Sequence, residues 1–207
     1  MERENEIDYL KLKNFYKMLI DLGINISIRK QVSNAIKVDF NKKFTSVEEI
    51  DTYLNNFQSK NNFYPISRNG ILLSNIFLIS NASNYKNSSE YYFNESDIIM
   101  FEKMFNAVEV NSKNFFMINI DVSNKQADNT QNLIDFFIDS YLTILKPKII
   151  IDMCTHNDKN SNKILKDYLQ SCFIIHIPHP SKIILNDQLK KEAWTNLKLL
   201  RTKLNDI

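Results

Sequence analysis

The sequence predicts an α/β protein: a central, mainly parallel four-stranded sheet with helices on both faces, in three α/β/α layers. Four apolar runs rich in β-favouring residues alternate with segments whose apolar residues have helical spacing, and this alternation is typical of the class. The chain has 207 residues and 43% hydrophobic content, enough for one substantial core. We therefore expect residues 1–207 to form a single domain, with a helical N-terminal part over about residues 1–60.

Two helices are expected before the first strand. Over residues 7–22 apolar side chains recur at helical spacing, and Gly23 ends the pattern. Residues 46–57 begin with Ser46 and two glutamates, which is a typical helix start, and continue with apolar residues at helical steps. Residues 24–45 are polar and mixed, and we assign no element to them.

The rest of the chain alternates strands and helices. The apolar runs predict strands within residues 70–80, 114–122, 147–153 and 172–177. The segments between and after them predict helices over residues 97–108, 130–145, 160–170 and 186–204. Because ligands of such sheets bind beyond the carboxyl ends of the parallel strands, we expect the loops after Ser80, Val122 and Pro178 to meet at one cleft.

Composition excludes several classes of site. With only Gly23 and Gly70 available, the chain cannot build a glycine-rich phosphate loop or a dinucleotide-binding fingerprint. Cys154 and Cys172 are not spaced for metal ligation or a redox pair, so we expect two reduced thiols, no metal site and no cofactor. No apolar run reaches the roughly 18 to 20 residues of a membrane-spanning helix, and the N-terminus is charged. We expect a cytoplasmic monomer without membrane contact.

Positive charge is concentrated in the C-terminal part of the chain. Residues 146–207 carry eleven Lys and Arg against six Asp and Glu, although the whole chain has a net charge of only +2. A basic segment of this kind suits a phosphate backbone, because neutralising phosphates releases counterions. The alternative is an ordinary solvated helix face.

The segment HPSKIILNDQLKKEAWTNLKLLR resembles the C-terminal signature of bacterial uracil-DNA glycosylases. The resemblance lies in His179 and Pro180, in Lys190 and Trp194 at the matching spacing, and in Leu197. Weaker matches extend it from about Phe15 to Leu204: the Leu-Gly-Ile step at residues 22–24, an asparagine at the end of the second strand, and Pro-Lys at the start of the third. It implies the uracil-DNA glycosylase fold. The branch concerned often carries an iron–sulphur cluster, but the cluster cysteines are absent here, so we expect none.

The first motif of the family is degenerate in this chain. Family members end their first strand with a Gly-Glu-Ala/Gly-Pro-Gly loop that cradles the flipped nucleotide and positions the attacking water, whereas this chain reads SNASN over residues 80–84. Only the alanine persists. By position, the resemblance implies that Ser80 and Ala82 contact the substrate. Asn81 stands where the family has glutamate, and an asparagine can orient a water without acting as a base.

The resemblance also implies roles for the later motifs. His179 would stabilise the negative charge that develops on the departing base oxygen. Asn119 would hydrogen-bond to the edge of the uracil ring, since an amide offers both a donor and an acceptor. The arginine- and proline-rich stretch that follows this asparagine in the family is missing here. The alternative is that Asn119 is a structural turn residue. Trp194 is expected to be a packing anchor. The side chains expected to contact the DNA backbone are Ser181, Lys182, Lys190 and Lys191.

Two functional hypotheses follow from this pattern. The first is a divergent DNA-repair glycosylase that needs no metal and hydrolyses the N-glycosidic bond of uracil in single-stranded or uracil-containing DNA. The second is a catalytically inactive descendant that binds DNA or a protein partner in a repair or replication assembly. An unrelated α/β protein remains the third reading, and it predicts that Ser80, Asn119 and His179 do not converge.

Overall fold

Strand β2 (Ile76–Ala82) is the central strand of a five-stranded sheet with the order β1-β3-β2-β4-β5. The strands β3 (Phe116–Asp121), β4 (Ile149–Asp152) and β5 (Phe173–His176) extend the sheet in parallel, and β1 (Ile66–Gly70) pairs antiparallel with β3. The α/β class and the mainly parallel sheet are therefore confirmed, with five strands instead of four.

The computed structural model describes one unit of the chain, within Ala35–Ile207. The described residues are 38–61, 63–64, 66–82, 93, 95–121, 130–154, 165 and 168–207. The helix expected over residues 7–22 lies outside them, and so does most of the helix expected over residues 160–170. The prediction of a single domain over the whole chain therefore stays a prediction.

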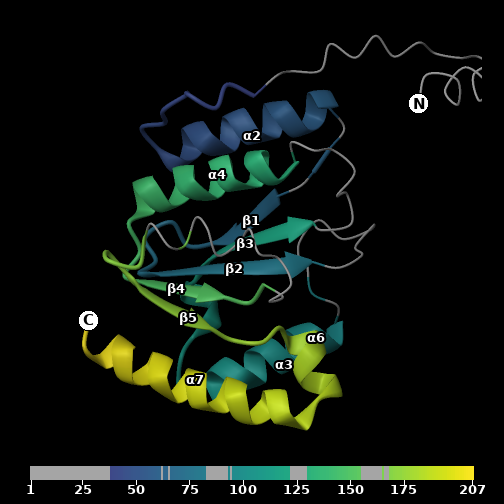
Figure 1. The fold of residues 1–207 in the computed structure, drawn as a ribbon, viewed down its shortest axis with the longest axis vertical. Helices are drawn as coiled ribbons and strands as arrows, with labels where there is room; N and C mark the ends of the chain where they lie inside the picture. Colours follow the sequence, from purple (N-terminus) through teal and green to yellow (C-terminus); the bar gives the residue numbers. More distant parts are fainter. Residues whose placement is uncertain are drawn as a thin grey trace, which may run out of the picture. The chain divides into compact units, whose positions relative to one another are not determined.

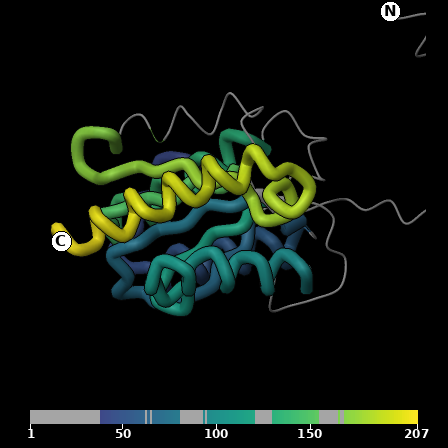
Figure 2. Tube along the Cα trace, turned by 90° about the horizontal axis from the view of Figure 1, so that it is seen from below, coloured from purple at the N-terminus to yellow at the C-terminus, as the bar shows by residue number. Residues whose placement is uncertain are grey.

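In the described part of the chain, five α-helices cover the two faces of the sheet (Figure 1). One face is covered by α2 (Val47–Asn61) and α4 (Thr130–Leu145), and the other by α3 (Glu95–Asn106), α6 (Pro180–Leu185) and α7 (Asp187–Asn205). In the view from below, α3 and α7 lie in front of the sheet, and α6 adjoins the start of α7 (Figure 2). This confirms the three layers. Within the described part of the chain, none of the helices has both the length and the apolar character needed to cross a bilayer.

Strand residues alternate between two separate cores. Phe77 and Ile79 of β2 pack beneath α2 and α4, whereas Leu78 packs beneath α3, α6 and α7. The same alternation continues in β4, where Ile150 and Ile151 are both fully buried on opposite faces. Each such side chain contributes roughly 1.5–3 kcal/mol through burial. Burial on both faces explains why these strands are continuous apolar runs in the sequence.

The first expected strand is displaced along the chain. Residues 71–75 form a turn, and the strand itself begins at Ile76. The turn exposes Leu73, which is 94% accessible although it belongs to the apolar run. Gly70 precedes the turn with a φ of 98°, and a Cβ added there would overlap the carbonyl oxygen of Phe115. Glycine is therefore required at this position.

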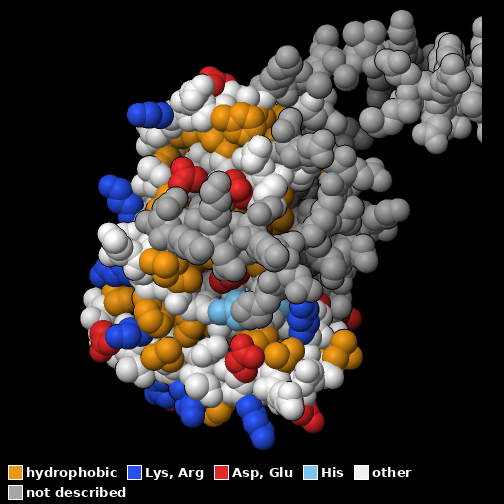
Figure 3. Space-filling model, viewed as in Figure 1, with side chains coloured by type: hydrophobic (Ala, Val, Ile, Leu, Met, Phe, Trp, Pro, Cys, Tyr) orange, Lys and Arg blue, Asp and Glu red, His pale blue; other side chains and the backbone are white. Residues whose placement is uncertain are grey.

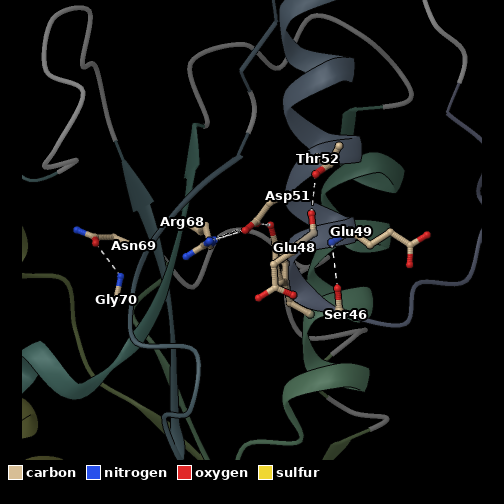
Figure 4. Close-up of polar contacts among 9 residues, drawn as sticks. Ser46, Glu48, Glu49, Asp51, Thr52, Arg68, Asn69 and Gly70 are labelled. Atoms are coloured by element: carbon tan, nitrogen blue, oxygen red, sulfur yellow. Dashed lines mark hydrogen bonds and ion pairs between the residues drawn. The ribbon is translucent and has the colours of Figure 1, made fainter.

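A polar triad of Asp51, Arg68 and Tyr141 joins β1 to α2 and α4, and Figure 4 shows the contact between Arg68 and Asp51. Arg68 Nε donates to both carboxylate oxygens of Asp51 at 2.9 Å, and its Nη2 also contacts Oδ2. The hydroxyl of Tyr141, which is fully buried, donates to Asp51 Oδ1 at 2.7 Å. Burial and this hydrogen bond raise the pKa of Tyr141 well above its ordinary value. The triad therefore connects three elements through one carboxylate.

Replacing the shared carboxylate should destabilise the fold. Asp51→Ala leaves the buried Tyr141 hydroxyl without its acceptor and the half-buried Arg68 without its partner, so we expect the free energy of unfolding to fall by about 2–3 kcal/mol in urea denaturation. Asp187→Ala is the matched control, because its pair with Lys190 is exposed and should leave the midpoint unchanged. Equal losses in the two variants would show that the triad does not hold β1.

Candidate functional site

Ser80 and Asn119 are neighbours on the face of the sheet covered by α3, α6 and α7. They are Cα partners in the pairing of β2 with β3. They follow Leu78 and Met117, which pack on that face, by two residues, so their side chains point to the same side. Ser80 is fully buried and Asn119 is 3% exposed. Neither Ser80 Oγ nor Asn119 Oδ1 has a hydrogen-bond partner among the described residues, so the hydrogen-bonding capacity of both atoms is unused.

His179 is the N-cap of α6, a short helix that the sequence pattern did not predict. Its Nδ1 accepts a hydrogen bond from the backbone N–H of Ser181 at 3.2 Å and lies 2.8 Å from the Ser181 hydroxyl. Because an accepting Nδ1 carries no proton, the neutral ring carries its proton on Nε2. Nε2 is enclosed and has no partner within the described part of the chain.

The protonation state of His179 follows from its surroundings. Burial, and to a lesser extent the charge of Lys182, lowers the pKa of His179 to about 4. The ring is 6% exposed and therefore neutral at pH 7. The site thus holds an uncharged donor, Nε2–H, that no described residue uses.

Phe93 connects His179 with a pocket that reaches Asn119. The ring centroids of Phe93 and His179 are 5.0 Å apart, and Phe93 also lines a pocket of about 370 Å³ together with Asn119. Neither His179 nor Ser80 is among the residues that line this pocket. Ser80 and Asn119 are thus paired neighbours, whereas His179 is linked to the Asn119 pocket only through the ring contact with Phe93.

The residues expected in the first loop belong to a strand instead. Asn81 and Ala82 pair with Ile120 and Asp121, so β2 continues two residues beyond Ser80. The expectation of a loop directly after Ser80 was therefore wrong, because the ladder with β3 extends to Ala82. The side chains of Asn81 and Ala82 are outside the description, and so is the chain that follows them; their proposed roles stay predictions.

The predicted DNA-contacting residues lie on α6 and the first turns of α7. Lys182, Lys190 and Lys191 are exposed, although Lys190 Nζ binds Asp187 Oδ1 at 2.6 Å. Ser181 is half-buried and is engaged with His179. Basic side chains gather along the lower edge of the molecule over α7 (Figure 3). Three lysines are thus accessible to a phosphate backbone.

Trp194 is not the packing anchor expected from the sequence. It is 44% exposed, and Lys198 Nζ lies 5.7 Å from its ring centroid. The buried stripe of α7 is formed instead by Ala193, Leu197 and Leu200. These smaller side chains set the rotation of the helix, which turns the indole outward.

Two buried residues on this face were not predicted from the sequence. Phe93, 6% exposed, comes from a polar stretch with no strand or helix periodicity, so no pattern marks it. Asp97, 4% exposed, lies in the first turn of α3, where the helix dipole favours a carboxylate.

No protein-family model matches the chain, and no curated protein matches it either. In the ranges that the structure describes, no cluster of three or more His, Cys, Asp or Glu side chains is arranged to hold a metal ion. The arrangement offers an amide, a neutral imidazole and an aromatic ring beside an apolar pocket. These groups can hold a planar, hydrogen-bonding molecule.

The low pKa of His179 predicts a specific pH dependence of stability. Its pKa is about 4 in the folded protein against about 6.5 when exposed, so the unfolded chain takes up the proton first. The contribution is fully present above pH 6.5 and is lost as the pH falls to 4, by up to about 3 kcal/mol. In urea titrations of wild type and His179→Gln, the difference between the two proteins should therefore shrink over this range. A difference that stays constant would contradict the buried, neutral state of the ring.

Proposed function

We propose that this chain is a divergent uracil-DNA glycosylase-like DNA-repair protein that hydrolyses the N-glycosidic bond of uracil in DNA. The observation that carries the proposal is the neutral His179 with an unused Nε2–H, whose ring packs on Phe93, while Phe93 lines the pocket that contains Asn119. The C-terminal resemblance supports the same proposal, because His179 is the histidine that carries it.

In the proposed reaction the oxygen of a water bonds to C1′ of the sugar as the bond from C1′ to the base nitrogen breaks. The water loses a proton, which ends on the departing base, so that the sugar keeps a hydroxyl. The bonding electrons leave with the base, and negative charge develops on its carbonyl oxygen. An Nε2–H donor from a neutral ring stabilises this charge in a site that excludes water. The Asn119 amide can pair with a carbonyl and the adjacent N–H of the base.

The proposed site requires a movement of Phe93. His179 Nε2 is enclosed, and the pocket does not extend to it. A base that contacts Asn119 and His179 together must therefore displace the Phe93 ring, which can then stack on the base. Extruding the base from the duplex costs a few kcal/mol, which pocket contacts must offset.

The surface around α6 supports DNA contact. Lys182 and Lys191 are exposed there, and Leu185 is 86% exposed on the same short helix as the Ser181 that holds the His179 ring. Apolar side chains that enter between base steps help to unstack a duplex. Positive charge and an exposed apolar side chain thus accompany the proposed base-binding site.

A second candidate function is a catalytically inactive relative that binds DNA or a protein. The enclosure of His179 Nε2 favours it, because this nitrogen is not accessible to solvent or to a substrate. The extended β2 strand also favours it, since Asn81 lies within the ladder rather than in a catalytic loop. In this second candidate function the basic surface still binds a partner, but the protein does not hydrolyse the glycosidic bond.

Uracil release from an oligonucleotide separates the two candidates. Removing a preorganised donor to a developing oxyanion typically costs about 10²–10³ in rate, so we expect that loss in His179→Ala. His176→Ala is the control, because His176 lies in β5 beside Asp152, 3.7 Å from its carboxylate, outside the proposed site. Equal rates in the two variants would remove His179 from the mechanism. No release by wild type, with DNA binding retained, would establish the inactive relative.

The salt dependence of DNA binding tests the basic surface. Each phosphate contact contributes about 0.9 to the slope of log affinity against log salt, so Lys182→Ala with Lys191→Ala should lower the slope by about two. Lys60→Ala with Lys148→Ala is the matched control, because these exposed lysines lie at the end of α2 and before β4. Fluorescence anisotropy with a labelled duplex measures both. A similar change in the two double variants would contradict a localised surface.

A further inference from the structure

The pocket beside Asn119 is longer than one base ring. Its lining includes Asn119 near the end of β3 and Phe115 just before that strand, which are about 13 Å apart at the rise of an extended chain. Because α3 crosses from β2 back to the start of β3, it runs antiparallel to β3 above the pocket. Ile98 therefore lies toward the Asn119 end, and Glu102, one turn later, toward the Phe115 end.

The Asn119 end of the pocket suits a planar heterocycle. Its walls are the side chains of Phe93, Ile98 and Met117, which can pack on both faces of a ring. The amide of Asn119 supplies the polar contact there, and its Oδ1 has no partner among the residues described. The buried position and the open hydrogen-bonding capacity are what a base edge requires.

The other end of the pocket is charged. Glu102, Ser112 and Lys113 line it, and the same three residues line an adjoining hollow of about 470 Å³. Neither the Glu102 carboxylate nor the Lys113 ammonium forms an ion pair with another described residue. A ligand can therefore extend from the apolar end into a polar space that holds an unused acceptor and an unused donor.

We propose that this pocket binds a free nucleoside, with the base at Asn119 and the sugar hydroxyls at Glu102. A volume of about 370 Å³ falls in the range that encloses ligands larger than a single ring. A carboxylate is the group that nucleotide-binding proteins use to accept hydrogen bonds from ribose hydroxyls. Lys113 balances the charge of Glu102 and can donate to a sugar oxygen.

The orientation has a chemical consequence. The sugar of the bound nucleoside lies at the Glu102 end, whereas His179 adjoins Phe93 at the other end. The nucleoside is therefore held without being cleaved and competes with an extruded base for Asn119. This competition rests on the proposed function, but the binding of the nucleoside does not.

Calorimetric titration of the full chain with uridine, 2′-deoxyuridine and uracil tests the proposal. We expect uridine to bind about tenfold more tightly than 2′-deoxyuridine, because its additional hydroxyl bonds to a charged group, and we expect uracil, which lacks the sugar, to bind more weakly than either nucleoside. Glu102→Gln should reduce this preference to about twofold, and Asn119→Ala should weaken all three ligands. Glu192→Gln, an exposed glutamate on α7, is the matched control and should change nothing.

Each outcome decides a separate question. Equal affinities for uridine and uracil, an unchanged preference in Glu102→Gln, or no saturable binding of any ligand would overturn the nucleoside site. The uracil-release assay is run in parallel on the same protein. Uridine binding without uracil release supports the pocket and removes the glycosylase; release without uridine binding does the opposite.

Discussion

The parallel pairing of β2 with β3 is the constraint on which the site depends. It runs over six residue pairs, from Phe77 with Phe116 to Ala82 with Asp121, and places Ser80 beside Asn119. A slip of one residue in the register would turn every side chain of the strand to the opposite face. Polar Asn119 would then take the place of apolar Ile118 in the core under α4. The same two hydrophobic cores that stabilise the sheet therefore fix the register of the polar residues at its end.

The periodicity of apolar residues predicted the long elements well and the short ones poorly. The helix over residues 130–145 has the expected bounds, because one apolar face repeats over four turns and packs on the sheet. Strand β1 could not be found in this way, since ISRNG has one buried apolar residue and is held by the contact of Arg68 with Asp51. Helix α6 has only six residues, too few for a periodicity to be read.

The candidate site was predicted in part, for a physical reason. Asn119 and His179 stand out as residue types at the ends of apolar runs, and both are buried in the fold. The protonation of His179 depends on its burial and on the cap at Ser181, neither of which is a local property of the sequence. Phe93 contacts His179 only through tertiary packing, which the local sequence does not reveal. Tertiary packing also decides that Trp194 is exposed, whereas the sequence predicted a packing anchor.

The outer edge of β5 has a consequence for self-association. In a four-residue strand paired on one side with β4, only Ile174 and His176 present their backbone groups outward. The carbonyl of His176 already accepts a hydrogen bond from Asn196 Nδ2 of α7 at 2.8 Å. An added strand would find few free groups and would have to displace that side chain, so this edge is a poor template for edge-to-edge aggregation.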